Sequence, residues 1–111
     1  MKLSHEDQRG VSVINIKGDM TAENADRFRR YALERLEADA RDFVLEFGEL
    51  ETMDSLGLES LLWLQEQATE RLGQIRLASC PDFLRDILRV TQLEPRLTCE
   101  HDSAAAIRSL G

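Results

Sequence analysis

The chain has 111 residues, of which 42% are hydrophobic, and its 14 basic and 21 acidic side chains give a formal net charge of −7. This length and composition predict one globular domain spanning residues 1–111. The acidic balance argues against nucleic-acid binding, which requires clustered lysine and arginine, and against attachment to an anionic membrane surface. It favours other proteins as partners.

No apolar run approaches the ~18 residues that a membrane span requires. The first ten residues, "MKLSHEDQRG", are too polar for a signal peptide. We therefore expect a cytoplasmic protein that is not inserted in a membrane. In a reducing compartment Cys80 and Cys99, which lack the spacing of a metal motif, are expected to be two free thiols. His5 and His101 have no neighbours suited to a metal, so no metal site is expected.

The N-terminal half of the chain predicts two strands, a helix and a third strand. Alternating and β-branched residues predict strands over 2–7 and 11–18, joined by a turn at Gly10 and therefore antiparallel. Apolar residues at helical spacing predict a helix over 22–38. The apolar run "FVLEF" at 43–47 predicts a buried strand.

The C-terminal half continues the alternation. A helix is predicted from about 56 to 72, with Gly73 as the residue that ends it. A strand over 74–79 and a helix that has Pro81 at its first helical position follow. A last strand and a last helix are predicted over 96–102 and 103–110. Strands that alternate with helices favour right-handed crossovers and parallel neighbours. The prediction is an α/β sandwich in the order β-β-α-β-α-β-α-β-α, with a mixed sheet of about five strands and helices mainly on one face.

The helix over 56–72 has two contrasting faces when it is unrolled at about 100° per residue. The stripe predicted to face the core consists of Gly57, Leu58, Leu61, Leu64, Ala68 and Leu72. The opposite face carries Leu56 and Trp63 among the acidic residues Glu59, Glu66 and Glu70. Either another segment of the domain covers Trp63, or Leu56 and Trp63 form a partner-binding patch, since tryptophan is a frequent anchor of interfaces.

The turn before this helix carries Asp54 and Ser55. Local chemistry predicts that Ser55 caps the helix. The same place is the positive end of the helix dipole, which favours a carboxylate or a phosphate. Asp54 and Glu51 have no nucleophile or cofactor motif beside them. We therefore assign no catalytic residue and no cofactor, and we do not expect an enzyme.

Three stretches in order carry a family resemblance: "FVLEFGEL", then "MDSLGLESLLWLQEQATERLGQIRLASC", then "PDFLRDILRVTQLEPRL". Together they resemble the STAS family, the anti-sigma factor antagonists. The stretch "IKGDMTAENA" is similar to the glycine-polar turn that leads into the first helix of that family. The resemblance covers essentially the whole chain and implies a STAS-type sandwich.

The resemblance also implies a function. Single-domain members bind an anti-sigma factor, often a serine kinase of the GHKL type, and so free a sigma factor. The kinase phosphorylates a serine at the head of the second helix, and a PP2C-type phosphatase reverses the reaction. The implied partner-binding residues are Asp19, Met20, Asp54, Ser55, Leu56, Gly57, Glu59 and Trp63.

One position departs from the family pattern. Asp54, Ser55 and Gly57 match it, but Leu56 occupies the place of the phosphorylated hydroxyl. The switch is then lost, or it has moved to Ser55 or Thr52, or the domain belongs to a branch without signalling. A cap at Ser55 would disfavour phosphorylation there.

The alternative functions are an accessory subunit of a transporter complex, similar to lipid-transport ABC systems, and a scaffold in a stress-signalling particle. The sequence predicts neither the identity of the partner nor the oligomeric state.

Overall fold

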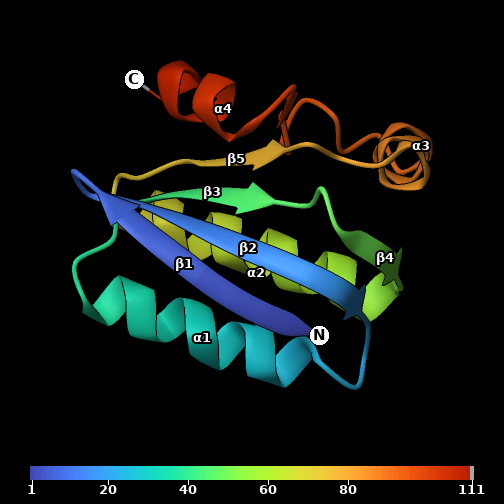
Figure 1. Cartoon of the computed structure of the whole chain (residues 1–111), viewed down its shortest axis with the longest axis horizontal. Coiled ribbons are helices and arrows are strands. Elements are labelled where there is room, and N and C mark those ends of the chain that lie inside the picture. The colour runs from blue at the N-terminus through green and yellow to red at the C-terminus, as the bar shows by residue number, and fades with distance from the viewer. Residues whose placement is uncertain (111) are drawn as a thin grey trace.

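The computed structural model describes residues 1–110, in which a six-stranded mixed sheet is covered by helices (Figure 1). The strands are β1 (Lys2–Gln8), β2 (Val11–Met20), β3 (Asp42–Glu46), β4 (Leu50–Met53), β5 (Ile75–Ala78) and β6 (Cys99–Glu100). The helices are α1 (Ala25–Glu37), α2 (Ser55–Glu70), α3 (Asp82–Val90) and α4 (Ser103–Ser109). The predicted α/β class and element order are confirmed, with β4 as an addition.

The sheet has the order β1-β2-β3-β5-β6, and β4 pairs separately with β2. The strands β1 and β2 form the predicted antiparallel hairpin. Its turn contains Arg9 and Gly10, with φ of 51° and 83°, and two consecutive positive φ angles suit the twist of a tight hairpin. The remaining pairs are parallel, as the crossovers require.

Strand β2 extends beyond the predicted end at Gly18. Its first part pairs with β3, and its last residues pair with β4 after a register shift between Gly18 and Asp19. Gly18 has a φ of 96°, which favours glycine at this irregularity. The four residues of β4 have no alternating pattern, so the sequence did not predict them. This extension carries Asp19 and Met20 toward the start of α2.

The core lies mainly on one face of the sheet. The helices α1, α2 and α3 bury Phe28, Leu61 and Leu84 in one cluster with residues of β2, β3 and β5. On the other face Ala106 of α4 packs against Val13, Val44 and Ala78. Figure 1 shows α4 on the opposite side of the sheet from α1. The prediction of helices mainly on one face is therefore confirmed.

Helix α2 differs from its predicted pattern at the C-terminal end. The buried residues of the helix are Gly57, Ser60, Leu61, Leu64 and Ala68. Leu72, predicted to face the core, lies beyond the helix, is 87% exposed and has a φ of 62°. Leu72 thus takes the left-handed position expected for Gly73. Gly73 has another role, since a Cβ atom there would lie 1.9 Å from the carbonyl oxygen of Arg41.

The expectation of two free thiols is wrong. Cys80 and Cys99 form a disulfide, with their Cα atoms 6.5 Å apart. The expectation came from an inferred compartment. In the fold, β6 runs parallel to β5 with Cys99 opposite Leu77, and Cys80 follows two residues after the end of β5, within disulfide reach of Cys99. In the same region Pro81 is the N-cap of α3 and not its first helical residue, so the helix begins one residue later than predicted.

Candidate functional site at the head of helix α2

Asp54 is the residue that caps α2, so the prediction that Ser55 is the cap is wrong. Its Oδ1 accepts a hydrogen bond from the backbone N–H of Gly57, and its Oδ2 accepts one from the N–H of Ala22, each at 2.9 Å. These bonds, led by that of Gly57, hold the pKa of Asp54 below its ordinary value of 3.8. Ser55 is the first residue of the helix and is exposed.

The head of α2 sits directly on the end of β2. A Cβ atom at Gly57 would lie only 2.1 Å from the carbonyl oxygen of Met20, so only glycine allows this approach. The same carbonyl accepts a hydrogen bond from the N–H of Asp54 at 3.3 Å. Met20 and Gly57 are both buried. Of the eight predicted partner-binding residues, these two support the surface from beneath.

A polar depression of about 460 Å³ lies beside the cap. It is lined by Asp19, Thr21, Ala22, Glu23, Asn24, Thr52 and Asp54. Thr52 Oγ1 donates to Asp19 Oδ1 at 2.6 Å, and Asn24 Nδ2 donates to the backbone oxygen of Asp19 at 2.8 Å. Among the described residues no group of histidine, cysteine and carboxylate side chains could hold a metal ion. The carboxylates that line the depression form an ordered acidic rim, and their oxygens can accept hydrogen bonds.

Leu56 stands next to this rim in the first turn of α2. Its side chain is 44% exposed, and it is one of three large hydrophobic residues exposed on the described part of the chain. Glu59, on the following turn, is also exposed. The backbone that carries this apolar side chain is fixed by the capped helix, and carboxylates stand two residues before it, at Asp54, and three residues after it, at Glu59. The arrangement can offer a partner an apolar contact with an acidic border.

Trp63 is less exposed than the helical pattern predicted. The ring is half-buried and packs against the main core. The guanidinium carbon of Arg29, on α1, lies 5.7 Å from the ring centroid, within the range of a cation–π interaction. Arg29 Nε also donates to Ser60 Oγ at 3.3 Å. Trp63 is therefore covered in part by its own domain, as the first alternative predicted. The exposed apolar surface around Leu56 and Trp63 is correspondingly smaller than the second alternative predicted.

A family model described as "Mlab, STAS domain" matches residues 3–98. The chain belongs to the STAS family. This establishes the resemblance that the ordered motifs indicated and accounts for the α/β sandwich. No curated protein matches the sequence significantly.

Solved structures share the STAS fold at low sequence identity. A protein from Thermotoga maritima described as an anti-sigma factor antagonist has a TM-score of 0.91 at 16% identity, covering 97% of this chain and 93% of that one. The phosphorylated form of the Bacillus cell fate determinant SpoIIAA has a TM-score of 0.77 at 18% identity, with coverages of 96% and 98%. A sulfate transporter family protein from Wolinella succinogenes has a TM-score of 0.74 at 23% identity, with coverages of 91% and 85%.

Two contributors to the site were not predicted from the sequence. Ala22 acts through its backbone N–H, and Arg29 acts across the contact between α1 and α2. Neither contribution can be read from a side-chain pattern, because both depend on how segments distant in the sequence meet. Among residues 1–110, none of the helices combines the length and the hydrophobicity that a membrane span needs.

Proposed function

We propose that this STAS domain is a protein-interaction module of the anti-sigma factor antagonist type, and that the head of α2 binds an anti-sigma factor with a GHKL-type kinase fold. The observation that carries the proposal is Leu56, an exposed apolar side chain held in the first turn of a capped helix beside an acidic rim. A fixed apolar group surrounded by polar groups is the usual form of an interface centre and its border.

The proposed surface has an outer and an inner layer. Leu56, Glu59 and the accessible part of Trp63 form the apolar and acidic contact, with Asp19 and Ser55 at its border. Asp54 holds the helix start through its two backbone hydrogen bonds. Met20 and Gly57 set the distance between α2 and β2 from the interior. The outer residues contribute to binding by direct contact with the partner, and the inner residues contribute by fixing the position of the helix that carries them.

We further propose that this surface is not switched by a phosphate at residue 56. The resemblance places the phosphorylated hydroxyl there, and leucine has none. Where the hydroxyl is present, a phosphate adds nearly two negative charges at the contact, enough to repel an acidic patch of the partner or to break an apolar contact. In this chain the apolar contact is permanent, and a PP2C-type phosphatase has no phosphate to remove at this position.

The experiment for the missing switch compares wild type with Leu56→Ser, each incubated with the partner kinase and ATP. We expect phosphate on residue 56 of the variant and none on wild type. Ser55 is exposed and, since Asp54 makes the cap, its hydroxyl is not required there. The double variant Ser55→Ala/Leu56→Ser keeps the new acceptor and serves as the control. Phosphate on Ser55 of wild type would overturn the proposal and assign the switch to that residue.

A second candidate is an accessory subunit of a transporter complex, similar to lipid-transport ABC systems. The fold similarity to a sulfate transporter family protein supports it, as does Leu56, because an accessory subunit needs no phosphate acceptor.

Affinity purification from the source cells, followed by mass spectrometry, separates the two functions. Our proposal predicts a GHKL-type kinase bound to wild type and lost from Leu56→Glu. Recovery of a transporter ATPase with its permease would instead support the second candidate.

A further inference from the structure

We infer that Cys80 and Cys99 are a reactive dithiol that exchanges with low-molecular-weight disulfides, and that Cys99 is the sulfur at which the reaction begins. Cys99 begins β6, at the edge of the sheet that is far from β1, and Cys80 lies two residues beyond the end of the neighbouring strand β5. Their Cα separation of 6.5 Å falls in the range that a disulfide spans. The pair is independent of the surface at the head of α2.

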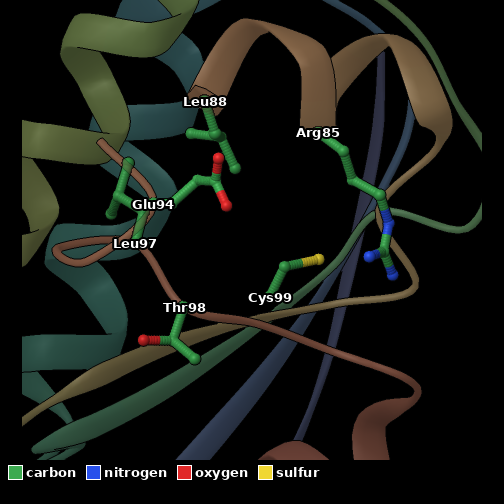
Figure 2. A pocket seen from close by; sticks show the side chains of 6 residues that line it. All are labelled: Arg85, Leu88, Glu94, Leu97, Thr98 and Cys99. Atoms are coloured by element: carbon green, nitrogen blue, oxygen red, sulfur yellow. The ribbon is translucent and has the colours of Figure 1, made fainter. Parts of the chain in front are cut away.

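The two sulfurs differ in access. Cys80 is buried, with 7% of its surface exposed, whereas Cys99 is half-buried. Cys99 lines a cavity of about 230 Å³ together with Arg85, Leu88, Glu94, Leu97 and Thr98. Figure 2 shows the sulfur of Cys99 directed into this cavity. A small disulfide can therefore approach Cys99 through the cavity, while Cys80 is shielded.

The charges around the cavity favour a thiolate at Cys99. In Figure 2 the sulfur points toward the side on which the guanidinium group of Arg85 lies, while the carboxylate of Glu94 enters the cavity on the opposite side, where Leu88 and Leu97 lie. Arg85 is held in place because its Nε donates to the carbonyl oxygen of Cys80 at 3.2 Å. A nearby cation stabilises the thiolate, which is the form that attacks a disulfide.

The reaction has two balanced steps. The thiolate of Cys99 attacks one sulfur of a disulfide RSSR, forms a mixed disulfide with one RS group and releases the other as RS⁻. The thiolate of Cys80, after losing its proton to solvent, then attacks the sulfur of Cys99. The Cys80–Cys99 bond forms, and the second RS⁻ leaves. The protein loses two electrons and two protons, and RSSR becomes two thiols.

The bond joins residues 19 positions apart and encloses α3 with the turn that follows it. That turn also contacts α2, since Gln65 Nε2 donates to the carbonyl oxygen of Arg96. Closing a loop of this length restricts the unfolded chain. We expect reduction to lower the melting temperature by about 10 °C.

The test starts from fully reduced wild-type protein incubated with oxidised glutathione. Mass spectrometry should show wild type losing two hydrogens and becoming resistant to thiol alkylation. Cys80→Ser should retain one glutathione on Cys99, and Cys99→Ser should react at least about tenfold more slowly at the buried Cys80. Arg85→Gln, added to Cys80→Ser, should slow the reaction several-fold. Arg89→Gln is the matched control, because Arg89 is exposed on the same helix and does not line the cavity.

Two results would overturn the inference. One is wild-type protein whose two thiols both stay open to alkylation after equilibration with oxidised glutathione. The other is glutathione addition to Cys99→Ser as fast as to Cys80→Ser, which would remove Cys99 as the entry point. Circular dichroism of each reduced variant confirms that the comparison is made between folded proteins.

Discussion

Both ends of helix α2 place an exposed leucine beside a buried glycine that touches a backbone carbonyl group. At the head these are Leu56 and Gly57, and at the tail they are Leu72 and Gly73. An added Cβ would come within 2.1 Å of a carbonyl oxygen at Gly57 and within 1.9 Å at Gly73. In both places the glycine seats the helix against the rest of the domain.

The two leucines differ in their settings. Leu56 is 44% exposed and lies within the helix, two residues after the cap residue Asp54, which lines the acidic depression. Leu72 is 87% exposed and follows the helix in a left-handed conformation. Exposure alone would rank Leu72 first as a contact residue. The fixed backbone and the polar residues near Leu56, rather than its exposed area, make Leu56 the better candidate for a partner contact.

The glycines give the largest expected effect. Gly57→Ala and Gly73→Ala should each lower the free energy of unfolding by about 3 kcal/mol, because the new methyl group meets a backbone oxygen that cannot move aside. Urea denaturation of both variants measures the loss. The matched control is Gly48→Ala, whose methyl group would meet no backbone atom: it would lie 2.9 Å from the end of the Glu46 side chain and at an ordinary 3.5 Å from the Cβ of Ser79, and should cost less than about 1 kcal/mol. Equal losses at all three positions would refute the close-approach explanation.

Trp63 lies between the two ends of α2 and gives the next largest expected effect. Replacing an exposed tryptophan would scarcely change stability, but the ring of Trp63 packs against the core and under Arg29. We now expect the substitution to lower the free energy of unfolding by about 2 kcal/mol. Arg29→Ala removes only the cation and should cost less than about 1 kcal/mol. Thermal unfolding that leaves Trp63→Ala as stable as wild type would show that the ring is not part of the packed head.

Asp54 gives the smallest effect, and it depends on pH. A carboxylate whose pKa is lowered in the folded state stabilises the protein above the unfolded value, and this stabilisation is lost as the pH falls through the folded value. The advantage of wild type over Asp54→Asn should therefore be largest above pH 3.8 and shrink below it. Urea midpoints measured across this range test the claim. Glu66→Gln, an exposed carboxylate on the same helix, is the control, and a constant difference for Asp54→Asn would contradict the prediction.

The fold was largely predictable because hydrophobic periodicity reports burial directly. The apolar spacing of α1 and the continuous run of β3 placed both elements within a few residues. Strand β4 was missed because four residues carry little pattern, and their pairing is set by the extension of β2 past Gly18. The disulfide was missed because the distance between Cys80 and Cys99 follows from the strand order and leaves no trace in their spacing.

The candidate site was predictable in part. The sequence located the head of α2 and identified the unusual Leu56, since both follow from local pattern. It assigned the cap to Ser55, because serine and aspartate are comparable caps and only the hydrogen bonds of Asp54 decide between them. It treated Met20 as a contact residue, whereas the parallel pairing with β4 turns that side chain into the core. Such details depend on how distant segments meet.

We propose that Leu56, and not exposed leucine in general, contacts the partner. The most direct test of this proposal is the dissociation constant of the purified partner, measured by titration calorimetry with Leu56→Glu and Leu72→Glu. The two positions are separated by about 24 Å along the helix direction, so a contact centred on Leu56 has Leu72 at most at its rim. We predict that Leu56→Glu weakens binding by about 30-fold or more and that Leu72→Glu changes it by less than about twofold. Equal binding by Leu56→Glu and wild type, or equal weakening by both variants, would contradict the account.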